Sequence, residues 1–198
     1  MEKYSSGLVA ESFWFTELKQ IIKLRYNNVS WDEIKKLCVE ENLLGIAKQS
    51  RSIRIYGYLK GRVDCIDKEL MEIFLSSDIE TQKLINIISV ARKNKLFLEF
   101  LYEVYREKAI IGHSELTPSD INIFFKDKQL QDSNIATWTD VTFRRLRSTY
   151  MNFLTDAGMV RLHNKKRLIT LPILDIVLEN YLVAHNEMTL LKALTGGR

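Results

Sequence analysis

The sequence predicts a mainly α-helical protein with one small β-hairpin near residues 160–170. Apolar residues recur at spacings of three and four through most of the chain, as on the buried face of a helix. Capping residues precede several of these stretches, and only 2 prolines and 8 glycines interrupt the 198 residues. We therefore expect helix-turn-helix and winged-helix segments, joined by short connections, around a central helical bundle.

Three helices are expected near the N-terminus. The first spans residues 12–26, where four large apolar residues share one face. Ser30 and Glu33 form a capping pattern that starts the second helix. Residues 42–45 break that helix, and a third covers residues 47–59. Three short helices with a tight turn before the third are typical of a helix-turn-helix domain.

The chain is expected to form two domains. The first is the N-terminal helix-turn-helix domain, residues 1–66, and the second covers residues 67–198. The second domain begins with a helical bundle, in which Asp67 caps one helix and Ser77 caps the next. Gly112 ends a longer helix that is rich in aromatic residues.

Residues 117–170 have the pattern of a winged helix. Thr117, which precedes a proline, starts one helix, and Thr139 starts another that ends at Gly158. Two alternating segments around the polar turn of residues 163–166 predict a two-stranded hairpin. Helix, helix and hairpin in this order predict a winged helix, and two further helices complete the chain.

Basic charge is concentrated in two segments of the sequence. Residues 42–63 hold five Lys or Arg and no acid, and residues 136–170 hold seven against two acids. Each segment carries +5 whereas the whole chain carries +4, so the remainder is net −6. Positive charge gathered in this way suits a phosphate backbone, because neutralised phosphates release condensed counterions. The charge pattern therefore favours a nucleic-acid partner.

The C-terminal basic segment supplies the first candidate surface. In the helix that follows Thr139, polar residues lie opposite the apolar arc, and one arginine lies at its edge. Such a helix fits the major groove, and the hairpin would meet phosphates or the minor groove. The alternative is a solvated face without a ligand. The residues assigned to DNA contact here are Arg144, Arg145, Arg147, Ser148, Asn152, Lys165, Lys166 and Arg167.

The helix over residues 47–59 supplies the second candidate surface. A rotation of 100° per residue places Ile53, Tyr56 and Leu59 inward and leaves Ile55 near the exposed side. An exposed Ile55 would favour the alternative that this face meets a protein. The residues assigned to DNA contact in this helix are Lys48, Arg51 and Arg54.

The sequence lacks the patterns of catalytic and metal sites. It has no GxxxxGK[ST] phosphate loop and no GxSxG, and its histidines and cysteines lack zinc-site spacing. We expect no metal and no cofactor. Glu99, Glu103 and Glu107 form a stripe at helical spacing that would suit a metal or a basic partner, but a solvated or salt-bridged stripe is the simpler expectation.

A cytoplasmic protein without a membrane span is expected. The longest uncharged runs are eight residues, whereas a spanning helix needs about 20 apolar residues. The polar N-terminus, with its early Glu2, is not typical of a signal peptide. Cys38 and Cys65 lie far apart in the sequence and lack CxxC spacing. We therefore expect two buried thiols in a reducing compartment.

Three stretches of the chain resemble the BrxA family: residues 4–8 followed by 12–13, residues 97–108 and residues 116–125. Their order and spacing extend the resemblance over nearly the whole chain. BrxA proteins are small accessory components of BREX, a bacterial defence system against phage. The resemblance implies an all-helical fold with helix-turn-helix or winged-helix parts, binding of double-stranded DNA, and no enzymatic activity.

The expected function is thus that of a double-stranded DNA-binding accessory protein in phage defence, with other BREX proteins as further candidate partners. Two alternatives stay open. One is a scaffold whose basic faces bind acidic proteins of the defence complex. The other is RNA binding, because the family has been described as similar to helical antitermination proteins.

Overall fold

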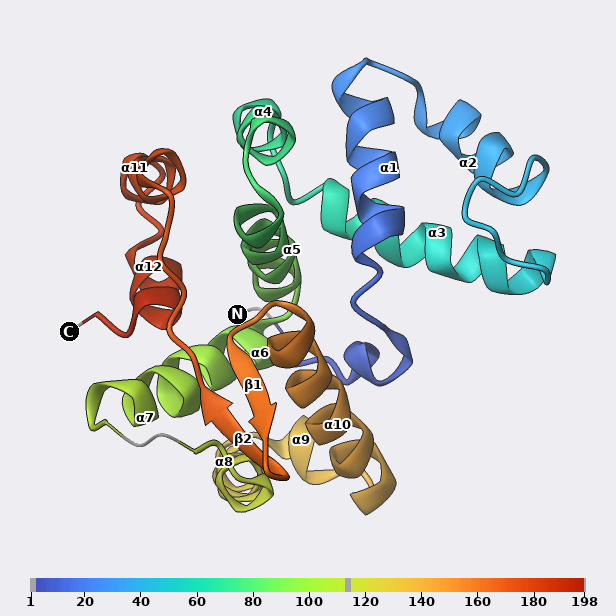
Figure 1. The fold of residues 1–198 in the computed structure, drawn as a ribbon. Coiled ribbons are helices and arrows are strands. Elements are labelled where there is room, and N and C mark those ends of the chain that lie inside the picture. Colours follow the sequence, from blue (N-terminus) through green and yellow to red (C-terminus); the bar gives the residue numbers. More distant parts are fainter. Residues whose placement is uncertain (1–2, 113–114, 198) are drawn as a thin grey trace. The chain divides into compact units, whose positions relative to one another are not determined.

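The structure, a computed structural model, describes residues 3–112 and 115–197. It is mainly helical with one two-stranded antiparallel sheet, which confirms the predicted fold class (Figure 1). The chain divides into two compact units. The N-terminal unit is Trp14–Ser89, and the C-terminal unit combines the residues up to Phe13 with those from Val90 onward. These bounds differ from the domain boundary expected after residue 66.

The N-terminal unit is held together by α1, which packs against both α3 and α4, and by α2, which packs against α3. Leu18, Ile21 and Ile22 form the buried face of α1, as predicted. The Ser30 hydroxyl accepts a hydrogen bond from the Glu33 N–H at 3.2 Å, so the predicted cap starts α2. The elements of this unit are α1 (Phe15–Tyr26), α2 (Trp31–Val39), α3 (Gln49–Val63), α4 (Lys68–Ser76) and the first part of α5 (Ile79–Lys93).

The predicted orientation of α3 was wrong for two isoleucines. Ile55 is 3% exposed and Ile53 is 45% exposed, the reverse of the expectation. The reason is that two polar residues share the buried face: Ser52, whose Oγ donates to the Cys38 carbonyl at 2.6 Å, and Arg62, which is fully buried. The prediction used the apolar residues alone, so it rotated the buried face of the helix toward Ile53 and away from Ile55.

The start of α5 also differs from the prediction, by one residue. The Asp78 carboxylate accepts from the Thr81 N–H at 2.7 Å, so Asp78 caps the helix in place of Ser77. The bond from Thr81 lowers the pKa of Asp78, because it stabilises the charged carboxylate. The Ser77 carbonyl instead accepts from the Gln82 side chain at 3.0 Å.

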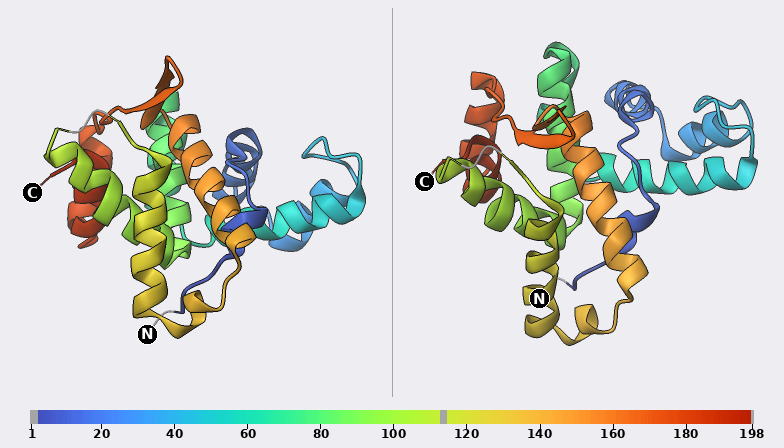
Figure 2. Two further views of the ribbon diagram at one scale, coloured as in Figure 1. Left: turned by 90° about the horizontal axis from the view of Figure 1, so that it is seen from below. Right: turned by 60° about the horizontal axis from the view of Figure 1, so that its bottom comes forward.

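In the C-terminal unit, α8 and η1 each pack against α10, and α12 packs against η2 (Figure 2). The π-helical segment η2 continues α6 into α7. The elements are η1 (Gly7–Ala10), the end of α5, α6 (Lys95–Phe100), η2 (Leu101–Arg106), α7 (Glu107–Ile110), α8 (Pro118–Gln131), α9 (Ser133–Ala136), α10 (Asp140–Asp156), β1 (Val160–His163), β2 (Lys166–Ile169), α11 (Ile176–Ala184) and α12 (Met188–Thr195).

An aromatic cluster forms the core of the C-terminal unit. The ring centroids of Phe97 and Phe100, both on α6, each lie 5.0 Å from that of Tyr150 on α10. Phe125 of α8 lies 5.7 Å from the same ring. Such ring pairs contribute about 0.5–1.5 kcal/mol each beyond their buried area. The cluster therefore fixes α8 and α10 beside each other on α6.

Local signals start α8 and close the hairpin as predicted. Thr117 and Asp120 form a full capping box, in which each side chain accepts from the other residue's N–H. In the hairpin, Val160 pairs with Ile169. The two residues of the turn, Asn164 and Lys165, have φ values of 48° and 64°, the left-handed geometry that a two-residue hairpin turn requires.

Two tyrosine hydroxyls predict opposite effects on stability. The Tyr150 hydroxyl is buried and has no hydrogen-bond partner within the described residues, whereas the Tyr105 hydroxyl donates to the Thr170 carbonyl at 2.9 Å. Tyr150→Phe should leave the free energy of unfolding unchanged or raise it by up to about 1 kcal/mol, and Tyr105→Phe should lower it by about 1–2 kcal/mol. Urea denaturation measures both, and a larger loss for Tyr150→Phe would contradict the assignment.

The bonds that the Asp120 carboxylate accepts from Lys108 and Thr117 predict that the protein loses stability in acid. Burial alone would raise the pKa of the Asp120 carboxyl, but the hydrogen bonds from Lys108 and Thr117 lower the pKa below its ordinary value. Because the folded pKa lies below the unfolded one, the stabilisation is present above pH 4 or so and disappears as the pH falls through the folded pKa. Asp120→Asn should cost about 1–2 kcal/mol at pH 7. In denaturation curves from pH 7 to 2, the two proteins should converge at the acidic end, and a constant difference would contradict the assignment.

Candidate nucleic-acid interface

The outer face of α10 carries exposed basic and polar side chains. Arg144, Arg145, Ser148 and Asn152 are all exposed, as predicted, while Tyr150 faces the core. Within residues 3–112 and 115–197, no carboxylate forms an ion pair with either arginine. The Ser148 hydroxyl donates to the Arg144 carbonyl at 3.1 Å and so stays close to its own helix. Both guanidinium groups are therefore available to an anionic ligand.

Arg147 lies at the edge of this face, as predicted. Its side chain is half-buried, and its Nη1 donates to Asn122 Oδ1 of α8 at 2.8 Å. A hollow between α8 and α10 surrounds this contact, and it is lined mainly by polar and charged side chains. The lining residues are Asn122, Phe125, Lys126, Gln129, Asp140, Phe143, Arg144 and Arg147.

Sequence reasoning missed the contribution of α8 to this surface. Asn122, Lys126 and Gln129 lie at i, i+4 and i+7 and therefore share one face of α8. That spacing was visible in the sequence, but Lys126 lies outside the basic segment of residues 136–170. The hollow places Lys126 beside Arg144 and Arg147, so the cationic surface extends across both helices.

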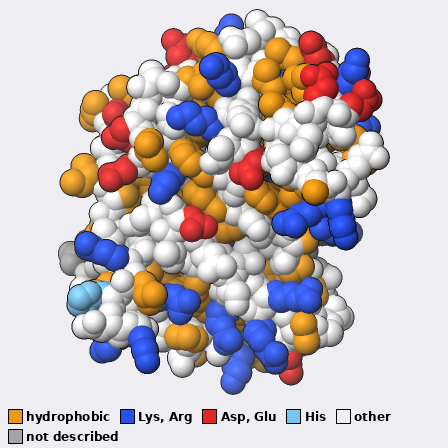
Figure 3. All heavy atoms as spheres, turned by 45° about the vertical axis from the view of Figure 1, so that its right-hand side comes forward, with side chains coloured by type: hydrophobic (Ala, Val, Ile, Leu, Met, Phe, Trp, Pro, Cys, Tyr) orange, Lys and Arg blue, Asp and Glu red, His pale blue; other side chains and the backbone are white. Residues whose placement is uncertain are grey.

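The hairpin adds a second group of cations after α10. Arg161 and Lys165 are exposed, and Arg167 is half-buried in β2. Lys166 lies 3.5 Å from Glu115, with the two side chains 65% and 35% exposed. An exposed pair of this kind contributes less than about 1 kcal/mol, so Lys166 can exchange Glu115 for another anion. Figure 3 shows Lys and Arg side chains gathered over the lower part of the face that holds α10 and the hairpin.

The N-terminal unit has a smaller basic surface at the start of α3. Lys48 occupies the cap position, and Arg51 and Arg54 follow on the exposed side of the first turns. No ion pair engages these three side chains within the part of the chain that the structure describes. The helix N-terminus adds partial positive charge at the same place.

Two of the five cations in the N-terminal basic segment do not contribute to this surface. Arg62 is fully buried, donates to Asn86 Oδ1 at 3.3 Å and lies 5.5 Å from the Trp14 ring centroid. Lys60 pairs with Asp64 and also contacts the face of a tryptophan. The exposed, unpaired charge of the segment is therefore +3, not the +5 counted from the sequence.

The described ranges also lack the features of a metal site and of a membrane span. No three His, Cys, Asp or Glu side chains there are close enough to hold a metal ion, and no helix there is long and apolar enough to cross a membrane. His113 lies outside those ranges. Burial raises the pKa of the Cys38 thiol to about 11, so this thiol is a poor nucleophile at neutral pH.

Comparison with known proteins identifies the family. The sequence model of the BrxA family matches residues 2–186. The chain belongs to the BrxA family. A curated relative from Bacillus cereus (strain H3081.97), described as "BREX protein BrxA", is 31% identical over 193 residues, which are 98% of this chain and 96% of the relative. The resemblance seen in the sequence is thereby confirmed, and it connects the chain to the BREX phage-defence system.

A solved structure supports the BrxA fold described above. The crystal structure of an uncharacterized protein from Magnetospirillum magneticum aligns with a TM-score of 0.84 and covers 98% of this chain and 100% of its own. The two sequences are 17% identical. At this level of identity, the likeness extends to the fold alone.

The backbone geometry of the hairpin turn predicts that the charge of Lys165 can be removed without loss of stability. Lys165 has a φ of 64°, which a side chain disfavours and glycine accepts. Lys165→Gly should leave the free energy of unfolding unchanged or raise it by up to about 1 kcal/mol. Lys165→Val is the control and should lower it by at least about 1 kcal/mol, because β-branching worsens the clash. Equal stabilities in thermal denaturation would contradict the turn geometry.

Proposed function

We propose that this BrxA family member binds double-stranded DNA and has no enzymatic activity of its own. The observation that carries the proposal is the exposed, unpaired cationic face of α10, followed directly by a basic hairpin in the same unit. α10 has 17 residues and is therefore about 25 Å long, enough to lie along a major groove.

The proposed mode of binding is that of a winged helix. α8 and α10 form the helix pair, and α10 enters the major groove with Arg144, Arg145 and Asn152 toward the bases. The hairpin is the wing, and Lys165 and Arg167 contact phosphates or the minor groove. Lys126 of α8 adds a contact to the backbone beside the groove.

The start of α3 provides a second contact in this proposal. α1, α2 and α3 act as a helix-turn-helix, and Lys48, Arg51 and Arg54 meet the phosphates of the duplex. Most of the assigned residues are cations, whose main interaction is with the phosphate charge and not with base edges, so little sequence selectivity is expected. We also propose a cytoplasmic location, where DNA is accessible.

Charge reversal on α10 tests the proposal. Arg144→Glu with Arg145→Glu should abolish binding of duplex DNA in fluorescence anisotropy while the helical circular dichroism is unchanged. Lys35→Glu with Lys36→Glu is the matched control, because these exposed lysines of α2 change the net charge equally but lie outside both proposed surfaces. Wild-type affinity in the α10 variant, or an equal loss in the control, would reject the α10 surface.

The salt dependence provides the second readout. If about six phosphates are neutralised, the logarithm of the affinity should fall with the logarithm of the salt concentration with a slope near −5. Competition with duplex RNA of equal length distinguishes RNA binding from DNA binding. Partner proteins retained after nuclease treatment, with no affinity for the duplex, would instead support a scaffold.

A further inference from the structure

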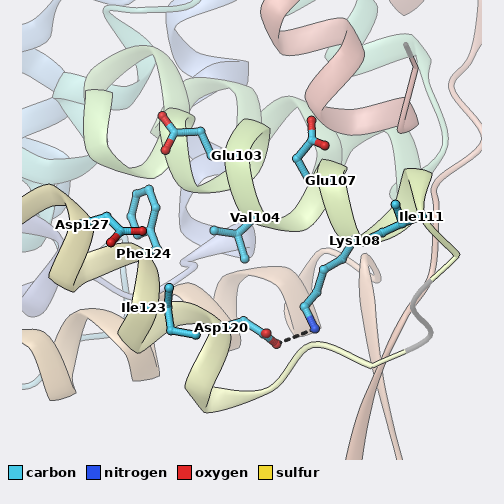
Figure 4. Close-up of a pocket in the computed structure, with 9 residues that line it drawn as sticks. All are labelled: Glu103, Val104, Glu107, Lys108, Ile111, Asp120, Ile123, Phe124 and Asp127. Atoms are coloured by element: carbon cyan, nitrogen blue, oxygen red, sulfur yellow. Dashed lines mark ion pairs between the residues drawn. The ribbon is translucent and has the colours of Figure 1, made fainter.

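A groove lies between the η2–α7 segment and α8 in the C-terminal unit, with a cavity of about 250 Å³ (Figure 4). Its walls are partly apolar. Figure 4 shows Val104 directed from η2 toward α8, with Ile123 across the cavity from it. Ile111 and Ile123 are 66% and 59% exposed, and the buried Phe124 of α8 also lines the cavity. A cavity with an apolar wall can hold one large apolar side chain of a ligand.

The rim of the groove is acidic. Four carboxylates line it, against one cation, Lys108. Lys108 is already engaged by Asp120, whose Oδ2 lies 2.7 Å from its Nζ, so it does not offset the remaining charge. The carboxylates of the lining are Glu103, Glu107, Asp120 and Asp127.

Buried cations hold two of these carboxylates in place. Lys128 is almost fully buried and lies 2.7 Å from both Glu99 and Glu103, and Arg106 pairs with Glu107. Burial alone would lower the pKa of Lys128, but its bonds to Glu103 and Glu99 raise it, so the amine stays charged. The expected salt-bridged stripe of glutamates is thus confirmed.

These ion pairs leave carboxylate oxygens of the rim available to accept further hydrogen bonds. A carboxylate can accept about four hydrogen bonds, and the bond from Lys128 uses only Oε1 of Glu103. Asp127 is exposed, and no cation in residues 3–112 or 115–197 forms an ion pair with it. Positioned carboxylates with open acceptor sites recognise Lys and Arg side chains.

We propose that this groove binds a segment of a partner protein in which an apolar side chain is flanked by lysines or arginines. The apolar residue enters the cavity beside Val104, Phe124 and Ile123, and the basic residues meet Asp127, Glu103 and Glu107. Charge complementarity selects this occupant and repels nucleic acid, so the groove is distinct in its chemistry from the α10 surface. The proposal does not depend on DNA binding.

The test is to pan a random peptide library displayed on phage against the immobilised full chain. Enriched sequences should share an apolar residue between basic ones. A synthetic peptide from that set is then titrated against two variants, Asp127→Lys and Ile123→Ser, by fluorescence anisotropy. Each variant should weaken binding at least tenfold, and neither should change the circular dichroism, since both side chains are exposed.

Matched controls separate the groove from general effects of charge and hydrophobicity. Glu41→Lys reverses an exposed carboxylate of the N-terminal unit, and Ile173→Ser removes an isoleucine that is 96% exposed in the C-terminal unit. Both should bind the peptide as the wild type does. Failure to enrich basic–apolar sequences, or equal binding by all four variants, would overturn the proposal. The peptide titration contains no nucleic acid, so its outcome is independent of the duplex experiments.

Discussion

The packing of three helices around Tyr150 determines what the C-terminal unit can present to a ligand. Rings from α6, α8 and α10 meet at this residue, and they set the rotation of α10 about its own axis. With Tyr150 and Leu146 directed inward, Arg144 and Arg145 must point outward, since residues on one helix are separated by 100° each. The candidate interface is therefore a consequence of the core rather than an independent feature of the surface.

Local signals in the sequence predicted much of the C-terminal unit, whereas tertiary contacts decide the buried face of α3 in the N-terminal unit. The cap at Thr117, the start of α10 at Thr139 and the hairpin turn depend on residues within four positions of one another, so they can be read from the chain. The buried face of α3 could not be read in this way. Arg62 is buried because Asn86 and Trp14, both distant in sequence, contact it, and this changes which isoleucine faces out.

Some surface residues could likewise be predicted from periodicity, whereas the roles of others depend on tertiary contacts. Outward positions on α10 followed from periodicity, because its apolar arc is continuous. The role of Lys126 depends on α8 lying beside α10, which the aromatic core decides. The burial of Lys128 likewise depends on glutamates of another helical segment, and from the sequence alone it resembles any other surface lysine.

α8 connects the two candidate surfaces, because its opposite sides face different neighbours. Asn122 and Lys126 line the hollow beside α10, whereas Ile123 and Asp127, one position further along, line the groove beside η2 and α7. A step of one residue turns a helix by 100°, so a cation and a carboxylate adjacent in sequence serve different surfaces. At physiological ionic strength the field of each charge is screened within about 8 Å. A basic segment in the groove and an anionic backbone on α10 can therefore each meet the opposite charge, with α8 between them.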